Sequence, residues 1–184
     1  AIIHAGDILP AYALYWMAAG LVDASPDAGL IYSDEDRLDA NGVRCEPRFK
    51  PDWSPELLRS ANYIGRIAAL RSDDLARAGG LKSEDVFSDS HDLMLRMSER
   101  LAAERIAHVP AILIHCGARD EGTGRIAAIE AHLSRNGIQA TVSEPSPGRY
   151  RIRYGLPQVL PLVSILIPTR DAFDLLNRCV ESVL

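Results

Sequence analysis

The sequence predicts an α/β fold, in which strands and helices alternate along the chain. Two apolar runs, 30–32 and 162–167, have the length and composition of buried strands. The segment 90–101 has the apolar periodicity of a helix that packs on one face. Its regularly spaced apolar residues are Leu93, Met94, Met97 and Leu101.

Turn and capping residues set the expected boundaries of these elements. Pro10 occupies a first helical position, and Ser54 is a good N-cap followed by proline. Asn41-Gly42 is a strong signal for a tight turn, and glycines after residues 78 and 136 end two helices. The expected helices cover 11–22, 72–78, 90–101, 125–135 and 173–184. The expected strands cover 2–3, 30–32, 64–71, 106–115, 138–142, 149–153 and 162–167.

Composition excludes several classes of protein. The 184 residues carry 20 Lys and Arg against 25 Asp and Glu, so the net charge is −5, which argues against a nucleic-acid binder. Hydrophobic residues make up 47%, enough for a core, but no apolar run reaches the roughly 18 residues that span a bilayer. The three cysteines form no CxxC pair, which argues against a disulfide scaffold or structural zinc and favours a reducing, cytoplasmic location.

The clearest chemical motif is the acidic run from Ser33 to Asp36. We expect it to form a loop directly after the strand 30–32, at the carboxyl edge where open α/β sheets bind ligands. There, Asp34 and Asp36 are close enough to share one hard cation, whose coordination a diphosphate can complete. The alternative is a solvated acidic loop. In either case, each carboxylate should be partly exposed or have a partner, because burying it unpaired is costly.

Two other groups of residues have a functional and a structural interpretation. Asp89, His91 and Asp92 lie at a helix start, where the helix dipole favours carboxylates, although one of them can instead serve as a general base. Trp53 lies in a loop between two prolines and is either a platform for a sugar ring or an anchor in the core. His115 ends a strand and is expected to be a hydrogen-bonded structural histidine.

Several segments, in the right order, resemble bacterial family 2 glycosyltransferases that build O-antigen and other surface polysaccharides, including the rhamnosyltransferase type. The carrying segments are Ile31-Tyr32-Ser33-Asp34-Glu35-Asp36, Gly42-Val43-Arg44, Pro47 to Leu58, Asn62-Tyr63-Ile64-Gly65, Gly79-Gly80-Leu81, His91 to Arg96 and His108-Val109-Pro110. A second stretch, 163–184, is similar to the opening strand and helix of such a domain. The resemblance implies a partial GT-A domain, a Rossmann-like nucleotide-sugar fold with a mixed sheet, followed by the start of a second one.

This resemblance implies a division of the chain and a role for each candidate residue. Residues 1–115 would be the C-terminal half of one GT-A domain, 116–160 a linker unit of a helix and two short strands, and 161–184 the start of a tandem domain. The implied roles are donor binding by Asp7, Asp34 and Asp36, a Mn²⁺ or Mg²⁺ site at Asp34, Asp36 and His4, proton acceptance by Asp92 or Asp89, and acceptor contacts by Asp52 and Trp53. The implied partners are a nucleotide-sugar donor and a glycan acceptor, on a cytoplasmic protein that can associate with the inner face of the membrane.

Two departures from the family pattern bear on activity. The main metal motif, typically Asp-x-Asp-Asp, reads His4-Ala5-Gly6-Asp7, and the position of the acceptor-activating aspartate is occupied by Ser90. They favour the alternative of a non-catalytic carbohydrate- or nucleotide-binding domain that positions a tandem catalytic one. We therefore expect the chain to be part of a longer protein and not to transfer sugar by itself. The strand 162–167 is expected to fill a vacant position in the sheet, within the chain or by exchange with a second copy in a homo-oligomer.

Overall fold

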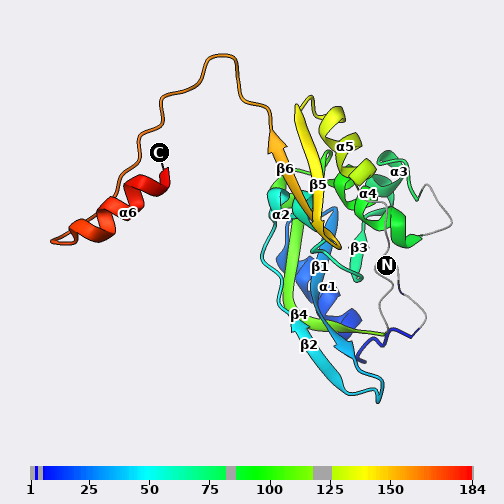
Figure 1. The fold of residues 1–184 in the computed structure, drawn as a ribbon. Coiled ribbons are helices and arrows are strands. Elements are labelled where there is room, and N and C mark those ends of the chain that lie inside the picture. The colour runs from blue at the N-terminus through cyan, green and yellow to red at the C-terminus, as the bar shows by residue number, and fades with distance from the viewer. Residues whose placement is uncertain (1–2, 4–5, 82–85, 118–125, 184) are drawn as a thin grey trace.

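The structure is a computed structural model that describes residues 3, 6–81, 86–117 and 126–183, with side chains omitted at 86–89. Its centre is a four-stranded mixed sheet (Figure 1). The strand β1 (Leu30–Leu38) pairs in parallel with β4 (Ile106–Cys116) on one edge. On its other edge, β1 pairs antiparallel with β2 (Arg44–Arg48) and β3 (Ala68–Leu70). This α/β architecture with parallel and antiparallel strands is compatible with a Rossmann-like domain, as the sequence predicted.

The register of the parallel pair is interrupted at Pro110. Ser33 lies opposite Val109, but the next residue of β1 lies opposite Ile112, so β4 carries extra residues at this point. Proline lacks a backbone N–H and cannot donate to a ladder, which explains why an irregularity forms around it. The expected strand 106–115 is therefore one continuous element.

Helices cover both faces of the sheet. On one face, α1 (Ala13–Asp23) packs through Ala13 and Met17 against Ile31 and Val109. On the other face, Leu30 and Tyr32 belong to a second cluster with the helices α2, α4 and α5. The side chains of β1 thus alternate between the two cores, as strand geometry requires. The helices on and around the second face are α2 (Pro55–Ser60), α3 (Ser72–Arg77), α4 (Val86–Ser98), the 3₁₀ turn η1 (Ala103–Arg105) and α5 (Ile126–Arg135).

A hairpin formed by β5 (Ala140–Ser146) and β6 (Arg149–Tyr154) lies beside α5 (Figure 1). Tyr150 of β6 is buried, and so are Ile129 and Leu133 of α5, in the same core cluster as Leu58 and the apolar face of α4. The segment expected to be a linker unit does contain one helix and two strands, and these strands and helix pack on the body of the domain. The division of the chain at residues 115 and 160 stays a prediction.

The prediction of a strand at 162–167 is wrong. These residues have no secondary structure, and Leu162 and Leu166 are 96% and 92% exposed. A continuous apolar run forms a buried strand only beside a partner strand, and no described strand of this chain pairs with it. The segment therefore fills no vacant position in the sheet of its own chain, while exchange with a second copy remains a prediction.

The final helix α6 (Phe173–Val183) follows this segment and has no buried residue (Figure 1). It has a polar and an apolar side, and Phe173 and Leu175 on it are exposed. Among the described residues, no helix is both long and apolar enough to cross a membrane.

Candidate functional site

The acidic run lies inside β1 and not in a loop after it. Asp34, Glu35 and Asp36 are only 3%, 4% and 3% exposed, so the expected loop is wrong, and of exposure or a partner it is the partner that each carboxylate has. The strand continues to Leu38 because β2 pairs with its second half. Burying three successive carboxylates requires a partner for each of them, and the structure provides these partners from four surrounding segments.

Asp34 is bonded to the backbone and to a histidine of the neighbouring strand. Its Oδ1 accepts hydrogen bonds from the Lys50 backbone N–H at 2.9 Å, and lies 2.9 Å from Nε2 of His108. The other ring nitrogen of His108, Nδ1, lies 3.3 Å from Oδ1 of Asp52, whose side chain is almost fully exposed. One imidazole therefore connects a buried carboxylate to a carboxylate at the surface.

The ring of His108 is held from one side by an aromatic side chain. Tyr32 stacks on it with ring centroids 4.9 Å apart and an interplanar angle of 19°. The Tyr32 hydroxyl donates to the Pro51 carbonyl at 2.7 Å, which ties the ring to the loop that carries Asp52. Burial, together with the hydrogen bond to Tyr63, raises the pKa of Tyr32, so this hydroxyl keeps its proton and remains a donor.

Asp36 repeats the same arrangement further along β1. Its Oδ1 lies 2.5 Å from Nδ1 of His115 on β4, and its Oδ2 accepts from Nε of Arg44 at 2.7 Å. His115 is thus a hydrogen-bonded residue at a strand end, as predicted. Neither a site role for His108 nor the contact between His115 and Asp36 was predicted from the sequence. The sequence signal for these contacts was the presence of two histidines on the expected strand 106–115, which pairs in parallel with β1.

Asp7 reaches the same edge of the sheet through β4. Ile8 forms a bridge with His115, and the side chain of Asp7 accepts from the Gly117 backbone N–H at 3.0 Å and from Arg66. The structure therefore brings Asp7 to the end of the strand that holds Asp36. His4, the third expected metal ligand, lies outside the described residues.

The described residues contain no group of three or more His, Cys, Asp or Glu side chains arranged to hold a metal ion. The oxygen atoms of Asp34 and Asp36 that face the neighbouring strand are engaged by His108, His115 and Arg44. These contacts account for the burial of both carboxylates without a cation.

A buried ion pair supports the strand from the opposite side. Lys50 Nζ donates to Glu35 Oε2 at 3.1 Å and to the Ile64 carbonyl at 2.6 Å. Burial lowers the pKa of Lys50, and the Glu35 carboxylate opposes this shift. Gly65, with φ +74°, is required beside the pair, because an added Cβ would lie 2.1 Å from Glu35 Oε2. The pair fixes the loop 49–53 against β1.

The two residues expected on the acceptor side of that loop differ in position. Asp52 projects from the surface and contacts His108. Trp53 is partly buried and packs against the core cluster. Of its two interpretations, the anchor in the core is the one that agrees with this packing. Ser54 caps α2 by accepting from the Leu57 backbone N–H, as predicted.

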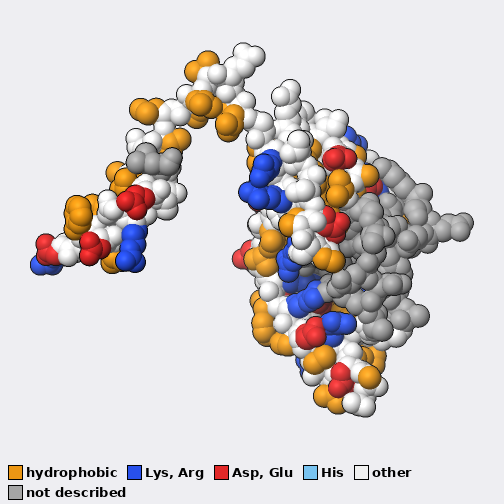
Figure 2. Space-filling model, in the orientation of Figure 1, with side chains coloured by type: hydrophobic (Ala, Val, Ile, Leu, Met, Phe, Trp, Pro, Cys, Tyr) orange, Lys and Arg blue, Asp and Glu red, His pale blue; other side chains and the backbone are white. Residues whose placement is uncertain are grey.

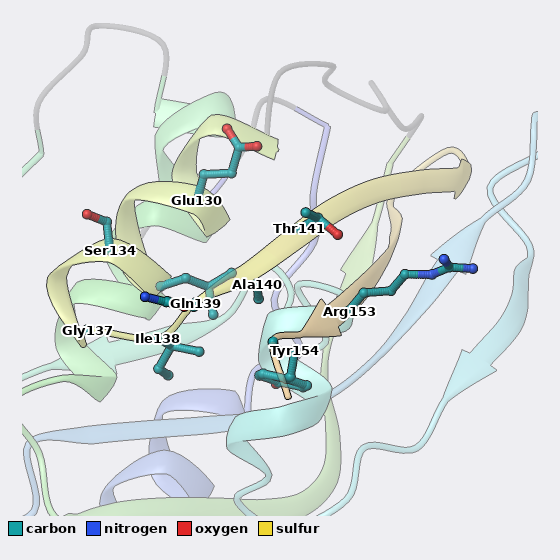
Figure 3. Close-up of a pocket in the computed structure, with 11 residues that line it drawn as sticks. Glu130, Ser134, Gly137, Ile138, Gln139, Ala140, Thr141, Arg153 and Tyr154 are labelled. Atoms are coloured by element: carbon teal, nitrogen blue, oxygen red, sulfur yellow. The ribbon is translucent and has the colours of Figure 1, made fainter. Parts of the chain in front are cut away.

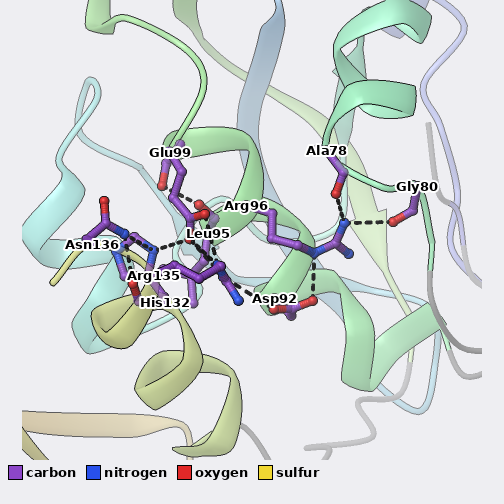
Figure 4. Close-up of polar contacts among 10 residues, drawn as sticks. Ala78, Gly80, Asp92, Leu95, Arg96, Glu99, His132, Arg135 and Asn136 are labelled. Carbon is purple, nitrogen blue, oxygen red and sulfur yellow. Dashed lines mark hydrogen bonds and ion pairs between the residues drawn. The ribbon is translucent and has the colours of Figure 1, made fainter.

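The expected proton acceptors lie on α4. Asp92 accepts from Arg96 Nε at 2.7 Å and lies 3.8 Å from Arg135 (Figure 4). The side chain of Asp89 lies outside the described residues. Ser90, at the position of the expected aspartate, accepts a hydrogen bond from Asn62 at 3.3 Å. The structure thus places Asp92 in an arginine network and does not bring it together with Asp34 and Asp36.

That network also docks α5 onto α4. Glu99 accepts hydrogen bonds from Arg135 at 2.7–3.0 Å and lies 2.7 Å from Nδ1 of His132 (Figure 4). Burial raises the pKa of the Glu99 carboxyl, but the hydrogen bonds from Arg135 and His132 outweigh it and hold the pKa below its usual value. The second ring nitrogen of His132 accepts from Arg59 of α2 at 3.2 Å, which links α2, α5 and the residue that follows α4.

Together, the sheet and the polar groups at the ends of its parallel strands define an α/β domain with buried carboxylate–histidine pairs. The chain is similar to the O-antigen biosynthesis protein RfbC of Myxococcus xanthus, with 40% identity over 99% of the chain and 15% of that protein. It is also 33% identical to the uncharacterized protein y4gI of Sinorhizobium fredii, over the whole chain and 22% of that protein. The chain therefore spans less than a quarter of the length of these relatives. No family model matches it.

Proposed function

We propose that the chain is a domain of a longer polysaccharide-biosynthesis protein that transfers a sugar from a nucleotide-sugar donor to a glycan acceptor. The observation that carries this proposal is the 40% identity to an O-antigen biosynthesis protein across nearly the whole chain. The fold supports it, because ligands of open α/β sheets bind beyond the carboxyl ends of parallel strands. Asp7, Asp36 and His115 meet at that edge.

In this proposal, Asp7, Asp34 and Asp36 lie on the donor side and Asp52 lies on the acceptor side with Trp53. His108 lies between Asp34 and Asp52, with ring nitrogens 2.9 Å and 3.3 Å from their Oδ1 atoms, and it holds the surface carboxylate at the rim of the sheet. A surface carboxylate fixed in this way can accept a hydrogen bond from a sugar hydroxyl. Asp92 or Asp89 remains the proposed proton acceptor, although Asp92 is already paired with Arg96.

A divalent cation, Mn²⁺ or Mg²⁺, would offset the charge of a leaving diphosphate in the longer protein. Asp34 and Asp36 supply the hard oxygen atoms that such a cation prefers. As arranged in this structure they do not fit one, because each is already bonded to a histidine and to a further donor. We derive no step through a metal.

A second candidate function is a non-catalytic carbohydrate- or nucleotide-binding domain. The observations that favour it are Ser90 at the position of the proton acceptor and the internal contacts of Asp34 and Asp36 with histidines. General-base catalysis contributes roughly 10²–10⁴-fold to a rate, so its loss leaves binding intact while transfer becomes undetectable.

A combined binding and turnover assay tests both functions. The 184-residue chain is titrated by calorimetry with a panel of nucleotide sugars and oligosaccharides, and donor hydrolysis and transfer are followed with Mn²⁺ or Mg²⁺. Binding without turnover supports the non-catalytic domain, and turnover that Asp36→Asn abolishes supports transfer by the chain itself. Asp73→Asn, an exposed residue of α3, is the matched control and should change neither result. A chain that folds but binds no nucleotide sugar and no oligosaccharide contradicts both candidates.

A further inference from the structure

A groove with a volume of about 850 Å³ lies between α5 and the open end of the β5–β6 hairpin, away from the candidate site (Figure 3). The helix contributes Glu130 and Ser134 to its wall. Gln139 comes from the turn before β5, and the strands contribute Thr141, Arg153 and Tyr154. Ligand sites commonly have volumes of about 300–1,000 Å³, so the groove is large enough for one or two sugar rings.

The polar side chains of this groove are available to a ligand. Glu130, Ser134, Gln139 and Thr141 make no side-chain hydrogen bond to any other residue in the described part of the chain, and they are exposed. Together they present hydroxyl, amide and carboxylate groups, which can both donate to and accept from a polyhydroxylated molecule. A hydrophobic ligand would leave them unpaired.

Tyr154 provides a rigid aromatic surface beside these groups. Its hydroxyl donates to Glu56 Oε2 at 2.7 Å and lies 3.5 Å from Nη1 of Arg59. The residue is nevertheless 46% exposed, so its hydroxyl is fixed by α2 while part of the residue faces solvent. Such a ring can pack against the apolar C–H groups of a sugar at little entropic cost.

One edge of the groove continues into a row of arginines. Arg149, Arg151 and Arg153 alternate along β6 with Tyr150, Ile152 and Tyr154, so the three arginines project from the outer face, and Arg153 and Tyr154 both border the groove at the end of the strand. The Cα atoms of successive arginines lie about 7 Å apart, because that is the rise of a strand over two residues. Within the described structure none of the three forms an ion pair. Figure 2 shows Lys and Arg side chains gathered over the side of the molecule where β6 lies.

We propose that this groove and the arginine row form a binding site for an acidic oligosaccharide. The Tyr154 ring and the groups of α5 and β5 would hold the sugar rings, and Arg151 and Arg153 would pair with carboxylates along the glycan. Three adjacent like charges without a counter-charge repel each other, and an anionic ligand along β6 relieves that repulsion. Guanidinium groups bind carboxylates with two parallel hydrogen bonds, which adds geometric selectivity.

Two other polyanions fit the site less well. A membrane surface or a nucleic acid presents phosphates without a dense set of sugar hydroxyls, so the carboxylate, hydroxyl and amide groups of Glu130, Ser134 and Gln139 would lack partners. The Glu130 carboxylate is a good acceptor for sugar hydroxyls. The concave shape of the groove also suits a single chain of rings better than a flat bilayer surface.

A titration with defined probes tests the proposal. The folded chain is titrated by calorimetry with an alginate-derived hexauronate, with neutral maltohexaose, with a single-stranded oligonucleotide and with anionic phospholipid vesicles. We expect the hexauronate to bind at least ten times more tightly than maltohexaose, and the affinity to fall with added salt because the charges are exposed.

Variants locate the site and separate it from the proposed donor site. Arg151→Gln/Arg153→Gln should weaken hexauronate binding at least tenfold, while the matched control Arg71→Gln/Arg100→Gln, on exposed positions elsewhere, should leave it unchanged. Asp36→Asn, in the proposed donor site, should also leave hexauronate binding unchanged. Hexauronate binding can therefore be tested separately from the proposed function. Equal binding of both hexasaccharides, equal losses in the two double variants, or tighter binding of the oligonucleotide or vesicles would overturn the proposal.

Discussion

The contact between Glu99 and Arg135 predicts how strongly α5 is fastened to α4. The two residues form a bidentate pair with distances of 2.7–3.0 Å, in which Glu99 is 16% and Arg135 35% exposed at the side chain. Fully exposed pairs contribute about 0–1 kcal/mol, and breaking a fully buried pair costs about 3–5 kcal/mol. Partial burial and two-pronged geometry place this pair between these limits, at about 1–2 kcal/mol of coupling.

A double-mutant cycle measures this coupling. The free energy of unfolding is obtained from urea titrations of the unsubstituted chain, Glu99→Gln, Arg135→Gln and the double variant. The matched control is the pair Arg37–Glu46, which has a similar distance of 3.0 Å but exposures of 31% and 60%. We expect at least twice as much coupling in the first pair as in the control.

The coupling should also depend on pH. Because the folded pKa of Glu99 lies below its usual value of 4.5, its contribution to stability is complete above that value and disappears as pH falls through the lower, folded pKa. The stability difference between the unsubstituted chain and Glu99→Gln should therefore shrink in acid. Equal coupling in the two pairs, or a Glu99→Gln difference that grows in acid, would refute the argument that partial burial strengthens this contact.

Two further predictions concern a thiol and a glycine. Burial raises the pKa of the Cys116 thiol to about 11. At pH 8, iodoacetamide should therefore modify Cys45 and Cys179 in the folded chain, while Cys116 reacts only after unfolding. Mass spectrometry measures the three rates, and equal rates would contradict the prediction. Gly65→Ala should destabilise the fold by about 2–5 kcal/mol, because Gly65 has a left-handed backbone and an added Cβ would clash with the buried ion pair. Gly80 also has a positive φ, but it has open space around it. Gly80→Ala should therefore cost only about 1–2 kcal/mol in the same urea assay.

The sequence predicted the elements whose signals are local. Pro10, Ser54 and the glycine pair at 79–80 mark element boundaries that the structure reproduces within a few residues. Helical periodicity predicted α4, and the alternation of elements predicted an α/β sheet. These features depend on neighbouring residues along the chain, which a sequence displays directly.

The errors arose where the outcome depends on partners distant in sequence. The run 162–167 has the composition of a buried strand, but composition cannot supply a neighbouring strand. Asp34 and Asp36 suggested an exposed loop because buried carboxylates are rare. Their burial is stable because β4 places His108 and His115 beside them. The register between β1 and β4 that does this depends on the irregularity at Pro110.

The stretch between Tyr154 and Phe173 has no helix or strand, and this has a consequence for recognition by α6. At 3.3–3.6 Å per residue, the segment 155–172 reaches at most about 65 Å, so α6 stays within that radius of the folded body. Short tethers that allow contact give an effective local concentration on the order of millimolar. A contact between α6 and the body with only millimolar affinity would therefore be substantially occupied, and a competing molecule in solution would need a comparable free concentration or a higher affinity to displace it.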